Sequence, residues 1–245
     1  MDMTQLVFLS QQMADYQSMD AIANNLANVS TPGFKRETPQ FQAYLEQMAP
    51  AEGQTGQQSV NFVAQMGSFR DLSEGPFELT GAPFDVALNG QGYFTIQTAN
   101  GPLYTRNGHF TLDASGRIVN DNGDPVQGTG GDISISANDG DIHIAADGTV
   151  SGQNGQIGQL NIVDFRDDRA LVKEGDSLYS TTQQSQSPTN TAVQQGAIET
   201  ANVRPVIEIS QMIEVMRSYQ ATLNLAQSQS DLQRQTIDKL ATTQS

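Results

Sequence analysis

Residues 202–240 read NVRPVIEISQMIEVMRSYQATLNLAQSQSDLQRQTIDKL and predict one long amphipathic helix. Asn202 is a suitable cap, Pro205 fits a first helical turn, and Glu208 favours the positive end of the helix dipole. The residues that would face a partner helix recur three or four positions apart, which places them on one face of the helix, here called the seam. They are Ile209, Met212, Met216, Tyr219, Leu223, Ala226, Ser230, Gln233, Ile237 and Leu240. Because this is the heptad pattern of a coiled coil, we expect the helix to pack against another helix.

A second amphipathic helix is predicted near the start of the chain, from about residue 4 to 28. The Ser30–Gly33 stretch ends it, since proline disfavours helix in the residue before it and glycine tolerates a positive φ. The apolar face of this helix comprises Leu6, Leu9, Met13, Tyr16, Met19, Ile22 and Leu26. Asparagine is a costly residue inside a helix, so Asn24, Asn25 and Asn28 either bond to a neighbouring subunit or mark fraying of the helix end.

Between the helices the sequence changes character twice. Residues 31–67 are rich in Gln, Pro, Gly and Ala, and we expect an extended connector there. Residues 68–201 contain short β-prone runs separated by turn signals, such as YFTIQT at 93–98 followed by Asn100-Gly101, which predicts antiparallel hairpins. The expected domains are 1–30, 31–67, 68–201 and 202–245. The expected fold class is α+β: paired long N- and C-terminal helices in a coiled-coil-like arrangement, an extended connector and a central all-β domain.

Composition argues against several functions. The 245 residues include 12 basic and 27 acidic side chains, a formal charge of −15, which disfavours binding to nucleic acid or to an anionic membrane. There is no cysteine, hence no thiolate metal site or disulfide. No apolar run is long enough for membrane insertion. The first basic residue is Lys35, so we expect no cleaved signal peptide.

Motifs for catalysis or metal binding are weak. The Asp-rich turns, such as 121–124, lack the order of a calcium loop, and Gly90 and Gly92 lack the third glycine and the helix of a nucleotide site. His109 and His143 have no recognisable metal or triad spacing. We therefore expect no catalytic residue, no metal and no cofactor, and regard a hydrolase as a remote alternative.

The terminal helices favour assembly. A helix over 204–240 would be roughly 55 Å long at about 1.5 Å per residue, longer than a compact β domain is wide. Its apolar face must be covered, either by a helical hairpin within a monomer or by neighbouring subunits in a filament.

Three stretches resemble the family of flagellar rod, hook and hook-associated proteins. They are ANNLANVSTPGFK at 23–35, GQGYFTIQTANGPLYTRNGHFTLDASGRIVNDNGDPVQG at 90–128 and residues 202–232 of the C-terminal helix. The resemblance implies a structural subunit whose terminal helices line an inner tube and whose β domain lies outside. It also implies other rod proteins and the flagellar type III export apparatus as partners, and the periplasmic rod of the basal body as the location.

Within that family, the short connector and the runs IHIAADGTVS at 142–151 and ALVKEGDSLYST at 170–181 favour a proximal-rod protein. A distal-rod protein is the alternative within the family, and a secreted adhesin or surface fibre is the alternative from another class. The resemblance also favours a subunit-contact role for the asparagines. The predicted interface residues are Leu6, Leu9, Met13, Asn24, Asn25, Leu26, Asn28, Pro32, Gly33, Phe34, Ile209, Met212, Met216, Tyr219, Leu223, Ile237 and Leu240.

Overall fold

A computed structural model describes residues 3–48 and 58–242. The chain divides into two compact units. The first contains residues 1–27, 37–70 and 204–245, and we call it the helix–hairpin unit. The second contains residues 28–36 and 71–203, and we call it the β unit. The chain therefore passes between the units four times.

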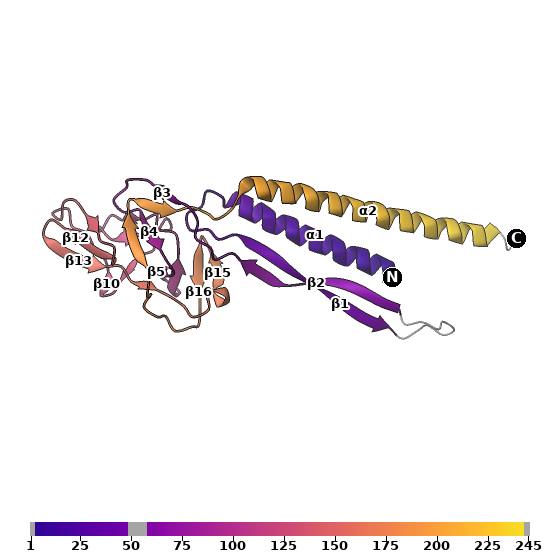
Figure 1. Cartoon of the computed structure of the whole chain (residues 1–245), viewed down its shortest axis with the longest axis horizontal. Coiled ribbons are helices and arrows are strands. Elements are labelled where there is room, and N and C mark those ends of the chain that lie inside the picture. Colours follow the sequence, from indigo (N-terminus) through magenta and orange to yellow (C-terminus); the bar gives the residue numbers. More distant parts are fainter. Residues whose placement is uncertain (1–2, 49–57, 243–245) are drawn as a thin grey trace. The chain divides into compact units, whose positions relative to one another are not determined.

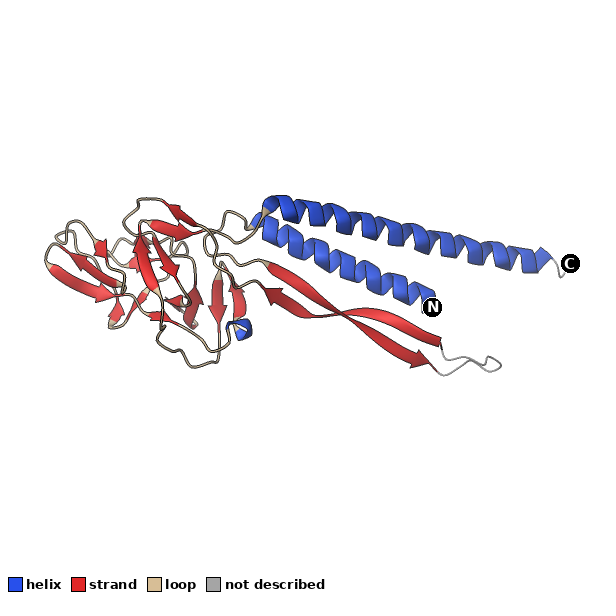
Figure 2. Cartoon of the chain, in the orientation of Figure 1, coloured by secondary structure: helices blue, strands red, loops and turns tan. Residues whose placement is uncertain are grey.

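The helix–hairpin unit contains two helices and one hairpin, shown in Figures 1 and 2. The helices are α1 (Met3–Ala27) and α2 (Pro205–Thr242), and the hairpin pairs β1 (Glu37–Met48) with β2 (Gln58–Arg70). Helix α1 contacts α2 and both hairpin strands. The helices run antiparallel, with the C-terminal end of α1 beside the start of α2 (Figure 1). Because α2 has 38 residues and α1 has 25, about 13 residues of α2, or roughly 20 Å, extend past α1.

The predicted fold class is wrong. Among the described residues the α-helices are α1 and α2 alone, they differ in length, and they do not form a coiled coil. Most other elements are strands. The expected extended connector is largely a long antiparallel hairpin, paired from Glu37 opposite Arg70 to Met48 opposite Gln58 with one register shift between Gln40 and Phe41.

The two errors have different physical causes. The buried side chains of α2, among those described, are Glu208 and Thr222, so the helix contact lacks the continuous apolar seam of a coiled coil. In the hairpin, Pro39, Gly67 and a register shift after Gln40 interrupt the period-two alternation that identifies a strand. Backbone pairing between the two strands stabilises them, and the pattern within either strand does not reveal that pairing.

The β unit is built from short antiparallel strands. Its largest sheet has the order β14-β5-β6-β16-β15, and β11, β12 and β13 form a three-stranded sheet. The pairs β17-β4, β18-β3, β7-β8 and β10-β9 complete it. The strands are β3 (Phe77–Leu79), β4 (Val86–Asn89), β5 (Tyr93–Thr98), β6 (Gly101–Thr105), β7 (Thr111–Leu112), β8 (Ile118–Val119), β9 (Gln127–Gly128), β10 (Gly131–Asp132), β11 (His143–Ile144), β12 (Thr149–Gly152), β13 (Gly155–Gln159), β14 (Ile162–Val163), β15 (Val172–Gly175), β16 (Leu178–Ser180), β17 (Ala192–Gln195) and β18 (Ala197–Glu199), with a 3-10 turn at Asp168–Ala170.

The β unit contains the main apolar core. Thirteen buried side chains from most of its sheets form one cluster, in which Phe94 and Phe110 meet edge to face at 5.1 Å between ring centroids. A smaller cluster contains Phe34, Ala201 and Val203, which joins the beginning of the unit to its end. The last strands close the unit, since β17 pairs with β4 and β18 with β3.

Candidate functional site

Helix α1 carries an apolar stripe whose side chains are exposed in the described structure. Leu6, Leu9, Met13 and Tyr16 recur at helical spacing and are 38% to 66% exposed. On another side of the helix, Ala14 and Ile22 are buried. A row of exposed, large apolar side chains is a candidate surface for contact with another molecule.

Helix α2 divides its predicted apolar face between two environments. Met212 and Tyr219 are half-buried, whereas Ile209, Met216 and Leu223 are exposed. Ile237 and Leu240 belong to α2, but their side chains lie outside the described residues. Further exposed apolar side chains lie off the predicted stripe: Val206, Ile207, Ile213, Leu225 and Leu232. They were not predicted as interface residues, because the predicted stripe follows a single heptad register and these positions fall outside it.

Asn25 binds its own chain. Its amide donates to the Glu37 carbonyl oxygen at 2.8 Å and accepts from the Glu37 backbone N–H at 2.9 Å. The same amide nitrogen donates to Glu208 at 3.3 Å, and both Asn25 and Glu208 are fully buried. This arrangement fixes the first residue of β1 against the end of α1 and the start of α2. Its predicted subunit contact stays a prediction.

The other predicted residues near the end of α1 have varied surroundings. Asn24 is exposed and Leu26 is half-buried. Asn28 follows the last residue of α1 and begins a turn, in which its carbonyl oxygen accepts from the Thr31 backbone N–H at 3.0 Å. Pro32 is half-buried in the same turn.

Gly33 and Phe34 lie inside the β unit. Phe34 is 2% exposed and packs in the small apolar cluster, with the Lys173 ammonium 4.6 Å from its ring centroid. Gly33 has a φ of 68°, and its N–H donates to the Glu199 carbonyl oxygen at 2.7 Å. These contacts are all within the chain, and a role for either residue between subunits stays a prediction.

A buried charged cluster adjoins Gly33. Glu199 accepts from Lys35 at 2.6 Å and lies 3.3 Å from Arg106, and all three side chains are at least nine-tenths buried. Burial lowers the pKa of Lys35 by removing water from its ammonium group, while Glu199 opposes this shift. The sequence did not predict this cluster, because residues 35, 106 and 199 are too far apart in the chain to form a local pattern.

The Asp-rich turns are explained by local hydrogen bonding. The Asp113 carboxylate accepts from the backbone N–H groups of Ser115 and Arg117, and Asp147 accepts from the N–H of Thr149. These bonds from backbone N–H groups lower the pKa of both aspartates. In the described ranges, no three His, Cys, Asp or Glu side chains are grouped to hold a metal ion. None of the helices described has the length and hydropathy to span a membrane.

Comparison with known proteins covers the helices and the β unit. Residues 9–35 match the family "Flagella basal body rod protein", residues 87–152 match "Flagellar hook protein FlgE/F/G D1 domain", and residues 194–239 match "Flagellar basal body rod FlgEFG protein C-terminal". The flagellar basal-body rod protein FlgF of Caulobacter vibrioides is 37% identical over 243 residues, 98% of each chain. This chain belongs to the flagellar basal-body rod protein family.

Relatives of this rod protein carry two names. The FlgG protein of Buchnera aphidicola subsp. Acyrthosiphon pisum is 36% identical over 83% of this chain and 86% of its own. The FlgF protein of Mesorhizobium japonicum is 31% identical over 89% of this chain and 90% of its own. The rod protein is a structural component of the flagellar basal body, which confirms the expected family.

Proposed function

We propose that this rod protein is a proximal-rod subunit that assembles through the exposed apolar faces of α1 and α2. The partners are the terminal helices of other rod proteins. Rigid packing of these helices transmits torque along the rod.

The observation that carries this proposal is the stripe of Leu6, Leu9, Met13 and Tyr16. Helix α1 contacts α2 and the hairpin, yet these four side chains stay exposed. Each Leu or Met of this kind gains about 1.5–3 kcal/mol when it is fully buried, and part of that gain is still available here. A neighbouring helix with an apolar face supplies such burial along the whole stripe.

The geometry of α2 supports the same proposal. Its exposed apolar side chains include Ile209, Met216 and Leu223, while its buried side chains, among those described, are polar. About 13 residues of α2 also extend past α1. Helices with little apolar burial inside their own chain draw stability from packing against others.

A substitution in the α1 stripe tests the proposal. Met13→Asp places a carboxylate on the stripe at a side chain that is 56% exposed in the chain itself. The variant should be absent from isolated basal bodies, because a buried unpaired carboxylate is costly in the assembled state. Thermal unfolding of the β unit should not change, since Met13 belongs to the other unit.

Met13→Leu is the matched control, because it keeps the apolar surface and a similar volume. It should be recovered in basal bodies like the wild type. Normal recovery of Met13→Asp would show that the stripe is not an assembly surface.

The proximal position is supported by one relative, a FlgF protein that is 37% identical to this chain. That match spans 98% of each chain, whereas a FlgG protein that is 36% identical spans 83% of this chain and another FlgG protein that is 29% identical spans 92% of it. Expression in strains that lack either FlgF or FlgG decides between the two positions. A proximal-rod protein restores motility in the first strain alone.

The remaining parts of the proposal rest on the family. They are location in the periplasmic rod, passage through the flagellar type III export apparatus without cleavage, and a structural role without catalysis or membrane insertion. The mass of the chain recovered from isolated rods tests cleavage directly.

A further inference from the structure

The beginning and the end of the β unit are joined by backbone hydrogen bonds. The Gly33 N–H donates to the Glu199 carbonyl oxygen at 2.7 Å, and the Asn202 N–H donates to the Phe34 carbonyl oxygen at 3.3 Å. These residues are more than 160 positions apart in the sequence. The two segments that enclose the unit, 28–36 and 197–203, are therefore held to each other.

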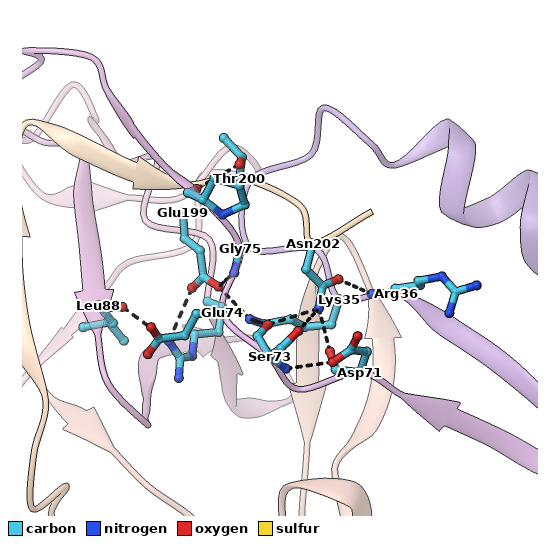
Figure 3. A network of polar contacts seen from close by, with 12 residues as sticks. Lys35, Arg36, Asp71, Ser73, Glu74, Gly75, Leu88, Glu199, Thr200 and Asn202 are labelled. Atoms are coloured by element: carbon cyan, nitrogen blue, oxygen red, sulfur yellow. Dashed lines mark hydrogen bonds and ion pairs between the residues drawn. The ribbon is translucent and has the colours of Figure 1, made fainter. Parts of the chain in front are cut away.

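The Glu199 side chain joins a third and a fourth segment to this pair, as Figure 3 shows in part. One carboxylate oxygen accepts from Lys35 at 2.6 Å and from the Gly75 N–H at 2.8 Å. The other lies 3.3 Å from Arg106. Lys35 also donates to the Ser73 carbonyl oxygen at 2.7 Å. One buried carboxylate thus serves two buried cations and a backbone N–H.

Asn202 makes a second set of links beside Glu199 (Figure 3). Its amide oxygen accepts from the Arg36 N–H at 2.7 Å, and its amide nitrogen donates to the carbonyl oxygens of Asp71 and Ser73 at 2.9 and 3.1 Å. The chain leaves the β unit after residue 36, returns at residue 71 and leaves again after residue 203. Asn202 therefore connects three of the four points at which the chain enters or leaves the β unit.

The Glu199 cluster depends on all its members. Without the Glu199 carboxylate, Lys35 and Arg106 would be buried cations without this counter-charge, which is strongly unfavourable. The approach of the segments also requires glycine, because a Cβ on Gly75 would lie 1.9 Å from the Thr200 carbonyl oxygen. Since the links share one carboxylate, losing it weakens every segment that it holds.

The Glu199 cluster adjoins the main core at Arg106, whose guanidinium donates to the Leu88 carbonyl oxygen at 3.5 Å, but its apolar neighbours lie apart from that core. The apolar residues beside it, Phe34, Ala201 and Val203, form their own cluster, separate from the thirteen-residue cluster of the sheets. A region with its own small set of contacts opens at a lower free energy than the core around it.

We propose that Glu199 and Asn202 form a latch that holds the entry and exit segments of the β unit together and that opens as a single cooperative step. When the latch opens, segments 28–36 and 197–203 separate while the main core stays folded. A pulling force applied to the chain at residue 36, 71 or 203 acts on the hydrogen bonds of the latch before it acts on the main core. The proposal concerns one chain and does not depend on the assignment to the proximal rod.

Native-state amide hydrogen exchange of the full chain with Glu199→Gln tests the latch. The reporters are the N–H groups of Gly33, Arg36, Gly75 and Asn202, each of which donates across the latch. Their protection should fall together, by a common factor of about ten or more. Reporters of the main core are the N–H groups of Ile118 and Val126, which donate to the carbonyl oxygens of Ile133 and Ile118. Their protection should not change.

Glu78→Gln is the matched control. It makes the same chemical change on β3, opposite Ile198 of β18, at an exposed side chain. All reporters should keep wild-type protection. Lys35→Met is a milder second variant, because it leaves Arg106 beside Glu199. It should lower the exchange protection of the four latch N–H groups together, by a smaller factor than Glu199→Gln.

Three results would overturn the proposal. Loss of protection at Gly75 alone would mean that the bonds open independently. An equal loss at Ile118 and Val126 would mean that the latch belongs to the global unfolding unit. Failure of Glu199→Gln to fold its β unit would mean the same.

Discussion

Gly33 has a backbone φ of 68°, which residues with a side chain rarely adopt. A Cβ at this position would also lie 2.5 Å from backbone atoms of Arg106 and Asn107. Two independent constraints, conformation and space, therefore require glycine. The fold of the chain itself therefore accounts for the glycine of the STPGFK segment, and no contact with another subunit is needed to explain it.

Gly33→Ala should destabilise the β unit by more than the roughly 1–2 kcal/mol of a left-handed alanine, because a steric clash adds to that cost. Gly81→Ala is the matched control, with a φ of 71° and no atom within 4 Å of the added Cβ. Chemical denaturation of both variants measures the difference. An equal loss of unfolding free energy in the two variants would show that the backbone of Arg106 and Asn107 moves away from the added Cβ without cost.

Asp168 is a half-buried acid whose charge the fold stabilises poorly. Burial raises its pKa, with a contribution from Asp164, and within the described structure its Oδ1 has no hydrogen-bond partner. Because the folded pKa lies above the unfolded one, the folded chain binds the proton more tightly. The charged form therefore costs stability at neutral pH, and that cost is relieved as the pH falls through the folded pKa.

Asp168→Asn should raise the melting temperature of the β unit at pH 7. The advantage should shrink as the pH is lowered through the folded pKa of Asp168 and be smallest below its unfolded pKa. Melting curves of the variant and the wild type from pH 3 to 8 measure this. An advantage that is constant with pH would show that the charge of Asp168 is not its cause.

At the scale of elements, the two helices of the helix–hairpin unit have few buried apolar side chains. Ala14 and Ile22 are the buried apolar residues of α1 among the side chains described, and the buried ones of α2 are polar. Asp15 adds a hydrogen bond from Ser218 at 3.1 Å between the helices. Polar contacts of this kind specify which faces meet, and in the proposed assembly apolar packing by neighbours supplies most of the stability.

Leu223→Asp should block incorporation into the rod, because Leu223 is 42% exposed and lies among the outward apolar side chains of α2. Melting of the β unit should change by a few tenths of a kcal/mol at most. Asn224→Asp is the control, since it adds the same charge one residue along without removing apolar surface. Recovery in isolated basal bodies and thermal unfolding are the measurements. Normal recovery of Leu223→Asp would contradict a required interface at this position.

At the scale of the whole molecule, the two units differ in how they are stabilised. The β unit has a thirteen-residue apolar cluster, and the helix–hairpin unit exposes apolar side chains on both helices. Isolated helices are marginal without tertiary packing. The two units should therefore differ in stability in the free chain.

In dilute monomer, amide exchange should be faster in α1 and α2 than in β5 and β6. Assembly into rods should slow exchange in the helices and leave the β unit unchanged, because the new contacts cover the helices. Hydrogen exchange before and after assembly measures this. Strong protection of both helices in verified monomer would show that the helix–hairpin unit is already complete.

The sequence by itself determined the elements whose signals are local. Helical periodicity predicted a helix at 4–28 and another from about 204, where the structure has α1 and α2. The Asn100-Gly101 turn predicted the hairpin of β5 and β6. The three resembling stretches predicted the family. Such signals succeed because helix periodicity and tight turns depend on residues within a few positions of one another.

Tertiary structure alone decided which helix faces are covered, whether 37–70 forms a hairpin, and how Glu199 is surrounded. Heptad spacing could not show that Met212 is half-buried and Met216 exposed, because that depends on where α1 lies. Pairing of β1 with β2 satisfies backbone groups of segments that have weak strand patterns. Glu199 is buried because Lys35, 164 residues away, and Arg106 neutralise it. Burial of a charge depends on partners brought together by the fold, and no local pattern records them.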